Sequence, residues 1–258
     1  MIFLANIGNT NLTYGLFDRE IVVSERHSIA DLANEKDIEK LCHTLLAKFQ
    51  LPACQITGAI LSSVVPEKTP LLMGAVRNSF SLEPFLISDE TTWKIDRSAY
   101  SGILGTDRLL CCQAALKKCE PPLVVIDCGT ATTLNVIDSS EAFVGGVILP
   151  GVFMGMQALA AATSLLNPAP FSAPNSVLGK NTAECMQSGA IYGAAAQLEG
   201  LIGQIRREMK KDLSIIITGG NAQILLPHIG LPLHYEPDLL LEGLAEKYIE
   251  IKDRGATK

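Results

Sequence analysis

One short polar turn occurs twice in this chain. Residues 5–12 read Ala-Asn-Ile-Gly-Asn-Thr-Asn-Leu, and residues 126–134 read Ile-Asp-Cys-Gly-Thr-Ala-Thr-Thr-Leu. Each copy follows an apolar run, places a polar residue two positions before a glycine, and continues through small hydroxyl or amide side chains into another apolar run. This pattern predicts a strand, a glycine turn and a second strand in each half. The repeat therefore favours two similar domains.

The composition of the turns indicates what they bind. Glycine has no Cβ, so backbone N–H groups and short hydroxyls can come close to an anion such as a phosphate. Two copies predict two domains that hold one phosphorylated ligand. The alternative is a pair of ordinary glycine hairpins whose amide side chains bond to their own backbone.

Length and charge narrow the class of protein. The chain has 258 residues, 48% of them hydrophobic and 19% charged, which is typical of an ordered globular protein. A net charge of -6 gives no support for a nucleic-acid or acidic-membrane partner. No apolar stretch approaches the roughly 20 residues of a membrane span, and no basic region precedes the first turn. Seven cysteines without a Cys-x-x-Cys pair are expected to be reduced. We expect a soluble, cytoplasmic protein.

Hydrophobic periodicity predicts the order of elements. The expected strands are 2–7, 12–17, 20–25, 58–65, 85–87, 123–127, 132–137, 142–148 and 214–217. The expected helices are 35–50, 68–80, one that runs from residue 106 or 107 to before Glu120, 152–162, 181–210 and 239–251. This order predicts a duplicated α/β fold. We place the domain limits at 1–118 and 119–258, with the last helix packing back on the first domain.

Asp107 is a candidate general base. It stands at the expected start of a helix, after Gly105 and Thr106. A carboxylate there can orient an attacking hydroxyl and accept its proton. It can equally cap the helix that follows, and spacing alone does not separate the two roles.

Blocks along nearly the whole chain together resemble the type III pantothenate kinases. They lie at 6–11, 62–66, 105–108, 127–133, 145–146, 150–151, 179–182, 218–220 and 241–244, in the family's order. The resemblance implies the actin and sugar-kinase superfamily, with two ribonuclease-H-like domains and a nucleotide cleft between them. It implies ATP-dependent phosphorylation of pantothenate to 4'-phosphopantothenate, the first step of coenzyme A biosynthesis. It also implies a homodimer that needs Mg²⁺ and either K⁺ or NH₄⁺.

The resemblance further implies roles for individual residues. Asp107 would be the catalytic base, and Asp127 would bind the monovalent cation. The implied ATP contacts are Asn6, Ile7, Gly8, Asn9, Thr10, Asn11, Leu12, Thr13 and Thr130. The implied pantothenate contacts are Tyr100, Gly105, Thr106, Asp107, Arg108 and Thr182, the last supplied across the dimer interface. Tyr100 as a packed aromatic and Thr182 as a helix cap are the alternatives from the residues alone.

Two features depart from the family pattern. Position 6 is Asn, whereas the family's motif begins with an Asp that helps to hold Mg²⁺, and an amide lacks the charge that a hard dication prefers. The segment between Tyr100 and Gly105 is shorter than usual. An alternative function is therefore a catalytically weakened paralogue that binds nucleotide or pantothenate as a regulatory or accessory protein. A phosphohydrolase on the same fold is a third reading.

Overall fold

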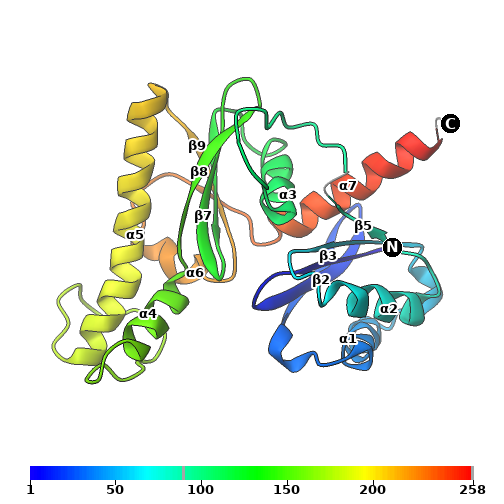
Figure 1. The fold of residues 1–258 in the computed structure, drawn as a ribbon, viewed down its shortest axis with the longest axis horizontal. Coiled ribbons are helices and arrows are strands. Elements are labelled where there is room, and N and C mark those ends of the chain that lie inside the picture. The colour runs from blue at the N-terminus through cyan, green and yellow to red at the C-terminus, as the bar shows by residue number, and fades with distance from the viewer. Residues whose placement is uncertain (89–90, 257–258) are drawn as a thin grey trace. The chain divides into compact units, whose positions relative to one another are not determined.

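The computed structural model describes residues 1–88 and 91–256 (Figure 1). The chain divides into two compact units. Unit 1 comprises Met1–Ile95, Ser101–Ala114 and Asp238–Lys258, and unit 2 comprises Asp96–Tyr100 and Ala115–Pro237. The chain therefore passes from one unit to the other four times. The domain limits expected from the sequence, 1–118 and 119–258, stay a prediction.

Unit 1 is built on a five-stranded sheet of order β3-β2-β1-β4-β5. Its strands are β1 (Ile2–Ile7), β2 (Asn11–Asp18), β3 (Glu20–Ser28), β4 (Gly58–Ser63) and β5 (Phe85–Leu86). β1 pairs antiparallel with β2, which pairs antiparallel with β3, and the pairings of β1 with β4 and of β4 with β5 are parallel. The central strand β1 is apolar except for Asn6, as expected of a strand that is covered on both faces.

Helices cover both faces of this sheet because successive side chains of a strand point to opposite sides. Phe3 and Ala5 lie in the core that also contains residues of α1 (Glu35–Lys48) and α2 (Thr69–Phe80). Leu4 and Ile60 lie in a second core, with Leu241 and Leu244 of α7 (Leu239–Ala256). α3 (Thr106–Ala115) contributes Leu110 to this second core. Short 3₁₀ helices lie at Ile29–Asp31 and Ala53–Gln55.

Unit 2 has a five-stranded sheet of order β10-β9-β6-β7-β8. Its strands are β6 (Leu123–Cys128), β7 (Ala131–Ile137), β8 (Phe143–Pro150), β9 (Ser214–Thr218) and β10 (His234–Tyr235). Its helices are α4 (Val152–Ala161), α5 (Thr182–Met209), α6 (Ala222–Leu225) and a 3₁₀ turn at Leu226–His228. The long helix α5 lies along the sheet (Figure 1) and packs Ile191 and Leu198 into one core with Val124 and Ile126.

The predicted duplication is confirmed by the topology. In each unit a central strand pairs antiparallel with the next strand, which pairs with a third, while two later strands add in parallel on the other side. β1 therefore corresponds to β6, and β4 to β9. Gly8 and Gly129 both follow the central strand of their sheet. The α/β fold class and most element positions are as predicted.

Several elements add to or differ from the expected ones. β4 ends at Ser63, whose hydroxyl accepts the N–H of Val65 at 3.1 Å. α3 ends at Ala115, well before Glu120, because its carbonyl accepts the N–H groups of Lys118 and Cys119 in a closing turn. β10 and α6 were not predicted because they are too short to show a period. Among the described helices, none is long and apolar enough to cross a membrane.

Candidate active site

The first turn joins β1 to β2 in unit 1. The N–H of Gly8 donates to the carbonyl of Asn11 at 2.9 Å, and the side chains between them are exposed. The side chains of Ile7 and Leu12 are instead buried in the hydrophobic core. These two predicted contacts can therefore reach a ligand only through their backbone. The exposed amide and hydroxyl groups of Asn9 and Thr10 are better placed for that role.

Asn6 is buried at the base of this turn. Its side chain is only 4% exposed, and its Oδ1 has no hydrogen-bond partner in the described part of the chain. In the sheet it stands opposite Thr13 on one side and Ser62 on the other. A buried acceptor without a donor costs free energy, so this oxygen is a candidate ligand-facing atom.

Ser62 connects Asn6 to the start of α3. Its hydroxyl is fully buried and lies 2.8 Å from the hydroxyl oxygen of Thr106. Thr106 is the first residue of α3, and Asp107 is the second. Unit 1 thus brings Asn6, Thr106 and Asp107 to one end of the sheet. Ser62 belongs to the block 62–66 of the family resemblance, but the sequence did not indicate a role for this serine.

The Asp107 carboxylate lies at the amino end of α3. It accepts the N–H of Arg108 at 2.7 Å, so it also satisfies one of the free backbone donors of the first turn. A Cβ at position 105 would come within 2.6 Å of its Oδ1, so Gly105 leaves room for the carboxylate. Burial raises the pKa of Asp107, and the hydrogen bond from Arg108 partly opposes that rise. A carboxylate with a raised pKa is a better proton acceptor than an ordinary one.

Tyr100 and Thr182 belong to unit 2. The ring of Tyr100 meets Phe143 edge-on, with centroids 5.3 Å apart, and the side chain remains partly exposed. Thr182 is the exposed first residue of α5. The residue that caps this helix is Asn181, whose side chain accepts the N–H of Glu184 at 3.0 Å. Thr182 is therefore not the cap.

The second turn joins β6 to β7. The N–H of Gly129 donates to the carbonyl of Ala131 at 3.1 Å. Asn221 holds the turn from outside, since its side chain donates to the Gly129 carbonyl at 3.0 Å and its N–H donates to the Cys128 carbonyl at 2.9 Å. The turn is thereby fixed by the segment that follows β9.

Gly151 and Gly219 allow the backbone of two neighbouring segments to lie close to the second turn. The N–H of Gly151 donates to the carbonyl of Thr130 at 3.0 Å, and a Cβ on Gly151 would overlap that same carbonyl. Gly219 has a φ of +99°, and a Cβ there would overlap Asp127 and lie 2.5 Å from the N of Cys128. The backbone at Gly151 and Gly219 therefore lies close to residues 127–130 of the second turn.

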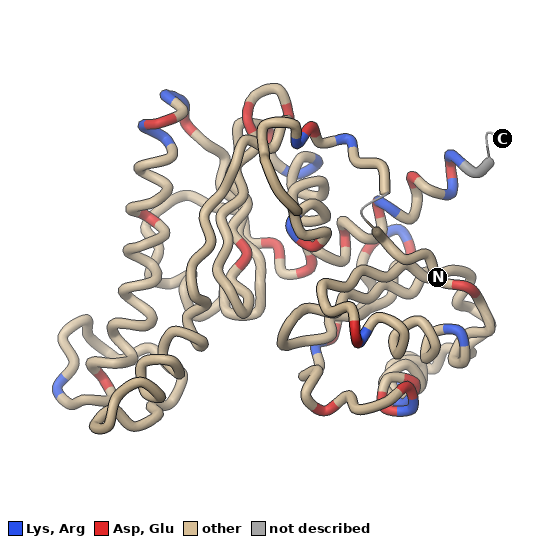
Figure 2. Tube along the Cα trace, viewed as in Figure 1, with Lys and Arg blue, Asp and Glu red and all other residues tan. Residues whose placement is uncertain are grey.

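We next considered the other charged and metal-ligating side chains of the described residues as possible sites. In the described ranges, no group of three or more His, Cys, Asp or Glu side chains could hold a metal ion. Basic side chains gather at the carboxyl end of α5 (Figure 2). Arg206 pairs there with Asp212 at 2.9 Å, and Lys211 donates to Ser139 at 2.6 Å. The helix dipole accounts for this cluster without a ligand.

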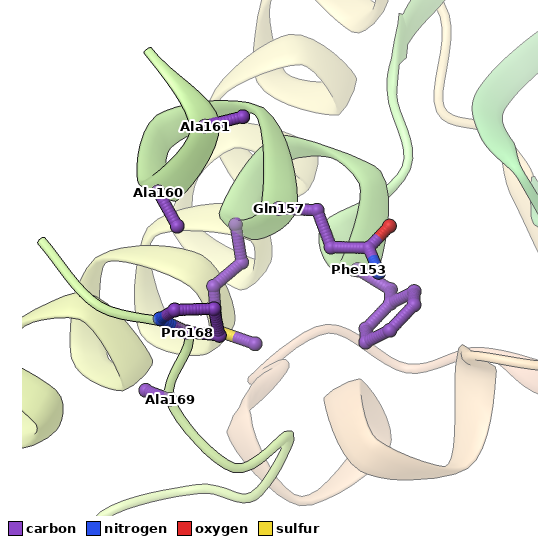
Figure 3. A pocket seen from close by; sticks show the side chains of 7 residues that line it. Phe153, Gln157, Ala160, Ala161, Pro168 and Ala169 are labelled. Carbon is purple, nitrogen blue, oxygen red and sulfur yellow. The ribbon is translucent and has the colours of Figure 1, made fainter. Parts of the chain in front are cut away.

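A cavity of about 470 Å³ lies beside α4 (Figure 3). Its lining is Phe153, Met156, Gln157, Ala160, Ala161, Pro168 and Ala169. Gln157 supplies the only polar side chain of that lining, and none of the predicted site residues is among them.

Comparison with known proteins gives a consistent picture. A family model described as type III pantothenate kinase matches residues 2–204. Type III pantothenate kinases of an Exiguobacterium species and of Acidiphilium cryptum are 32% and 34% identical, over 95% of this chain and 96% and 92% of theirs.

Solved structures share the fold at low sequence identity. An activator of 2-hydroxyisocaproyl-CoA dehydratase from Clostridium difficile, with bound ADPNP, has a TM-score of 0.57 at 13% identity, covering 100% of this chain and 97% of that one. MreB 5 of Spiroplasma citri, bound to AMPPNP, has a TM-score of 0.57 at 11% identity, covering 99% and 98%. The family model matches residues 2–204, and the two pantothenate kinases named above are 32% and 34% identical over 95% of this chain. The chain therefore belongs to the type III pantothenate kinase family.

Proposed function

We propose that this chain phosphorylates pantothenate with ATP and releases 4'-phosphopantothenate and ADP. Family membership supports the reaction class. The observation that carries the assignment is the carboxylate of Asp107 at the start of α3. The preceding residue, Thr106, forms a hydrogen bond with Ser62, and Ser62 lies opposite Asn6 in the sheet. A proton acceptor and a phosphate-type turn thus lie at the same end of one sheet.

Asp107 is the proposed base. It accepts the proton of the primary hydroxyl of pantothenate as that oxygen bonds to the γ-phosphorus of ATP. The bond from the γ-phosphorus to the β–γ bridging oxygen breaks, and ADP leaves. Phosphoryl transfer depends mainly on positioning and charge stabilisation, and Arg108 is the proposed partner for an anionic group of the substrate. Tyr100, Gly105 and Thr106 are the other proposed contacts to pantothenate within the subunit.

The two glycine turns are the proposed phosphate contacts. Asn9, Thr10 and Asn11 offer exposed amide and hydroxyl groups in the first turn, and the partly buried Thr130 is the proposed contact in the second. The remaining proposed contacts of the first turn, Asn6, Ile7, Gly8, Leu12 and Thr13, act through backbone or through the orphan oxygen of Asn6.

The second turn should be sensitive to any side chain at position 219. Gly219→Ala places a Cβ against Asp127 and Cys128 at a φ of +99°, and we expect a loss of about 3 kcal/mol of stability. The KM for ATP should rise with it. Gly200→Ala is the matched control, because it lies in α5 with nothing within 4 Å of its Cβ position, and it should raise the thermal midpoint slightly. Equal effects of both substitutions would contradict this account.

The residues fit a magnesium ion that is carried mainly by ATP. The described residues include no cluster of three acidic, His or Cys side chains, while the buried Oδ1 of Asn6 lacks a donor and presents one neutral oxygen. The bound ion would neutralise charge on the phosphates. For K⁺ or NH₄⁺ we propose Asp127, whose carboxylate lies next to the carbonyl-rich second turn.

We further propose a homodimer in which Thr182 reaches the partner's pantothenate site. Large apolar side chains are exposed on β8, α4 and the segment that leads to α5, where Leu165 is 87% exposed, Leu178 73% and Ile148 61%. The cavity beside α4 lies in the same region (Figure 3). Exposed apolar surface of this extent is typical of protein interfaces.

The dimer can be tested by adding charge to this surface. Leu165→Glu together with Leu178→Glu should convert the dimer to a monomer without unfolding it, as measured by light scattering and circular dichroism. The pantothenate KM should rise because each site loses the partner's Thr182. Val22→Glu, on β3 of unit 1 and 41% exposed in the wild type, should leave both unchanged. A double variant that stays dimeric would place the interface elsewhere.

An assay of the purified protein tests the function itself. We expect ADP formation that requires pantothenate, Mg²⁺ and either K⁺ or NH₄⁺. Nucleotide binding without phosphopantothenate would instead favour the regulatory role, and ADP formation independent of pantothenate would favour a phosphohydrolase. We propose the cytoplasm as the place of the reaction, because a reducing compartment suits a chain with seven cysteines.

A further inference from the structure

Ser62 on β4 lies against the first turn of α3. Its side chain is 0% exposed, and its Oγ lies 2.8 Å from Oγ1 of Thr106. A hydroxyl that is buried away from water needs such a partner, because an unpaired one costs free energy. Ser62, Thr106 and Asp107 all belong to unit 1. The hydrogen bond therefore links β4, within one compact unit, to the helix that carries the proposed base.

The sheet and the helix turn these two hydroxyls toward each other. Ile60 of β4 shares a core with Leu4 of β1 and Leu110 of α3. Ser62 stands two residues after Ile60, so it points to the same face of the sheet. Thr106 precedes Leu110 by four residues, so it lies on the same face of the helix. The hydrogen bond between them therefore extends the contact of α3 with the sheet by one further turn.

The first turn of α3 has little apolar packing of its own. The side chains of residues 106–108 are polar and only partly buried, whereas those of residues 109–112 are buried. Apolar packing thus fixes the body of the helix more firmly than its beginning. Asp107 accepts the N–H of Arg108, which orients the carboxylate within the helix but not relative to the sheet. The bond of Thr106 to Ser62 supplies this second constraint.

We propose that Ser62 is a positioning residue for Asp107. Through Thr106 it fixes the first turn of α3 relative to the sheet, and with it the carboxylate that accepts the proton of the substrate hydroxyl. The proposal rests on the proposed function, through the role of Asp107 as the base. Ser62 is fully buried and acts through α3. Because a misplacement of about 1 Å can cost roughly 100-fold in rate, even a smaller shift of the base is measurable.

The test removes the hydrogen bond from each side. Ser62→Ala deletes one hydroxyl, and Thr106→Val deletes the other while it keeps the shape of the side chain. Ser63→Ala is the matched control, because this neighbouring hydroxyl bonds to the N–H of Val65 at 3.1 Å and to Thr69 at 2.8 Å, both outside α3. Thr106→Val also provides the second break of the bond if Ser62→Ala does not fold.

Ser62→Ala should lower kcat about tenfold, with the KM for ATP within about twofold of wild type. The acid limb of the kcat/KM profile should move to lower pH, because burial raises the pKa of Asp107 and a looser first turn admits water to the carboxylate. Hydrogen exchange should be faster at the N–H of Leu109, which donates to the Gly105 carbonyl at 3.2 Å. Ser63→Ala should lower the thermal midpoint but leave kcat, the acid limb and this exchange unchanged.

A double variant shows whether the two hydroxyls act as one unit. Ser62→Ala combined with Thr106→Val should lower kcat no further than the single variant with the larger loss, because both substitutions break the same bond. Losses of kcat that multiply in the double variant would overturn the inference, since each hydroxyl would then act separately.

Two other results would also overturn it. The first is an unchanged kcat and acid limb in a folded Ser62→Ala variant. The second is an equal fall of kcat in Ser63→Ala, which would show a general effect of stability at the end of β4. A wild-type protein that does not phosphorylate pantothenate would overturn the proposed function itself. That failure is seen before any variant is made, and the exchange at Leu109 would still decide whether Ser62 holds the first turn of α3.

Discussion

Asp107→Asn should abolish most phosphorylation of pantothenate while the protein stays folded and binds ATP. We expect kcat to fall at least ~100-fold, the usual contribution of general-base catalysis. Turnover is measured by ADP release and nucleotide binding by calorimetry. Asp37→Asn is the matched control, because Asp37 also serves a helix start, where it accepts the N–H groups of Ala33 and Asn34 at 2.9 and 3.1 Å. If both variants keep near wild-type turnover, Asp107 is a helix cap and not the base.

Although it lowers activity, Asp107→Asn should increase the stability of the folded protein at neutral pH. Burial raises the pKa of Asp107 above its ordinary value of 3.8 in the folded protein. A carboxyl whose folded pKa is raised contributes stability below its unfolded pKa and loses it as the pH rises through the folded pKa. At pH 7, Asp107→Asn should therefore raise the thermal midpoint, and the gain should disappear in acid. The acid limb of the wild-type kcat/KM profile should lie above the pKa of an ordinary aspartate.

Asn6→Asp should lower the Mg²⁺ requirement of the enzyme. A carboxylate at this position gives a hard dication a charged oxygen, so we expect the half-saturating Mg²⁺ concentration to fall about tenfold, on the scale by which ligand charge changes cation affinity. Activity at low Mg²⁺ should rise. Asn9→Asp adds the same charge on an exposed side chain of the turn and should have little effect. Wild-type activity that is already full at low Mg²⁺, with no gain from Asn6→Asp, would show that ATP and water hold the ion adequately.

Asn6→Asp should also lower the stability of the protein when no ligand is bound. Position 6 is 4% exposed, and the wild-type amide oxygen there has no donor. An unpaired buried carboxylate should destabilise the ligand-free protein by about 3 kcal/mol. Mg²⁺ with a non-hydrolysable ATP analogue should recover much of this loss, because the ion pairs the charge. Recovery with the nucleotide and EDTA alone would contradict a metal-based explanation.

Regular periods in the sequence predicted most of the fold. The apolar runs at β1 and β6 and the two glycine turns located both sheets, because burial on two faces leaves a continuous hydrophobic stretch. β10 and α6 were not predicted, because elements of two and four residues are too short to show a hydrophobic period. The sequence predicted only that α3 ends before Glu120, and its last residue is set by a turn closed by the Ala115 carbonyl.

Pairings between distant residues could not be predicted from one sequence. The hydroxyl contact of Ser62 with Thr106 joins a residue of β4 to the first residue of α3, and the two positions lie 44 residues apart in the sequence. Lys247 fits the sequence of a surface helix, and only the fold shows it against Trp93. The resemblance named the site residues, but it could not say that Ile7 and Leu12 point into the core.

The interleaving of the two units constrains how the protein is made. α7, which supplies Leu241 and Leu244 to the core around Leu4 and Ile60, is the last element of the chain. During synthesis the first sheet therefore emerges from the ribosome before α7, and until α7 has been translated one face of this sheet lacks the helix that contributes Leu241 and Leu244 to its core. Every strand and helix of unit 2 is available by residue 237. The carboxyl-terminal unit is thus able to complete its core before the amino-terminal one, the reverse of the usual vectorial order.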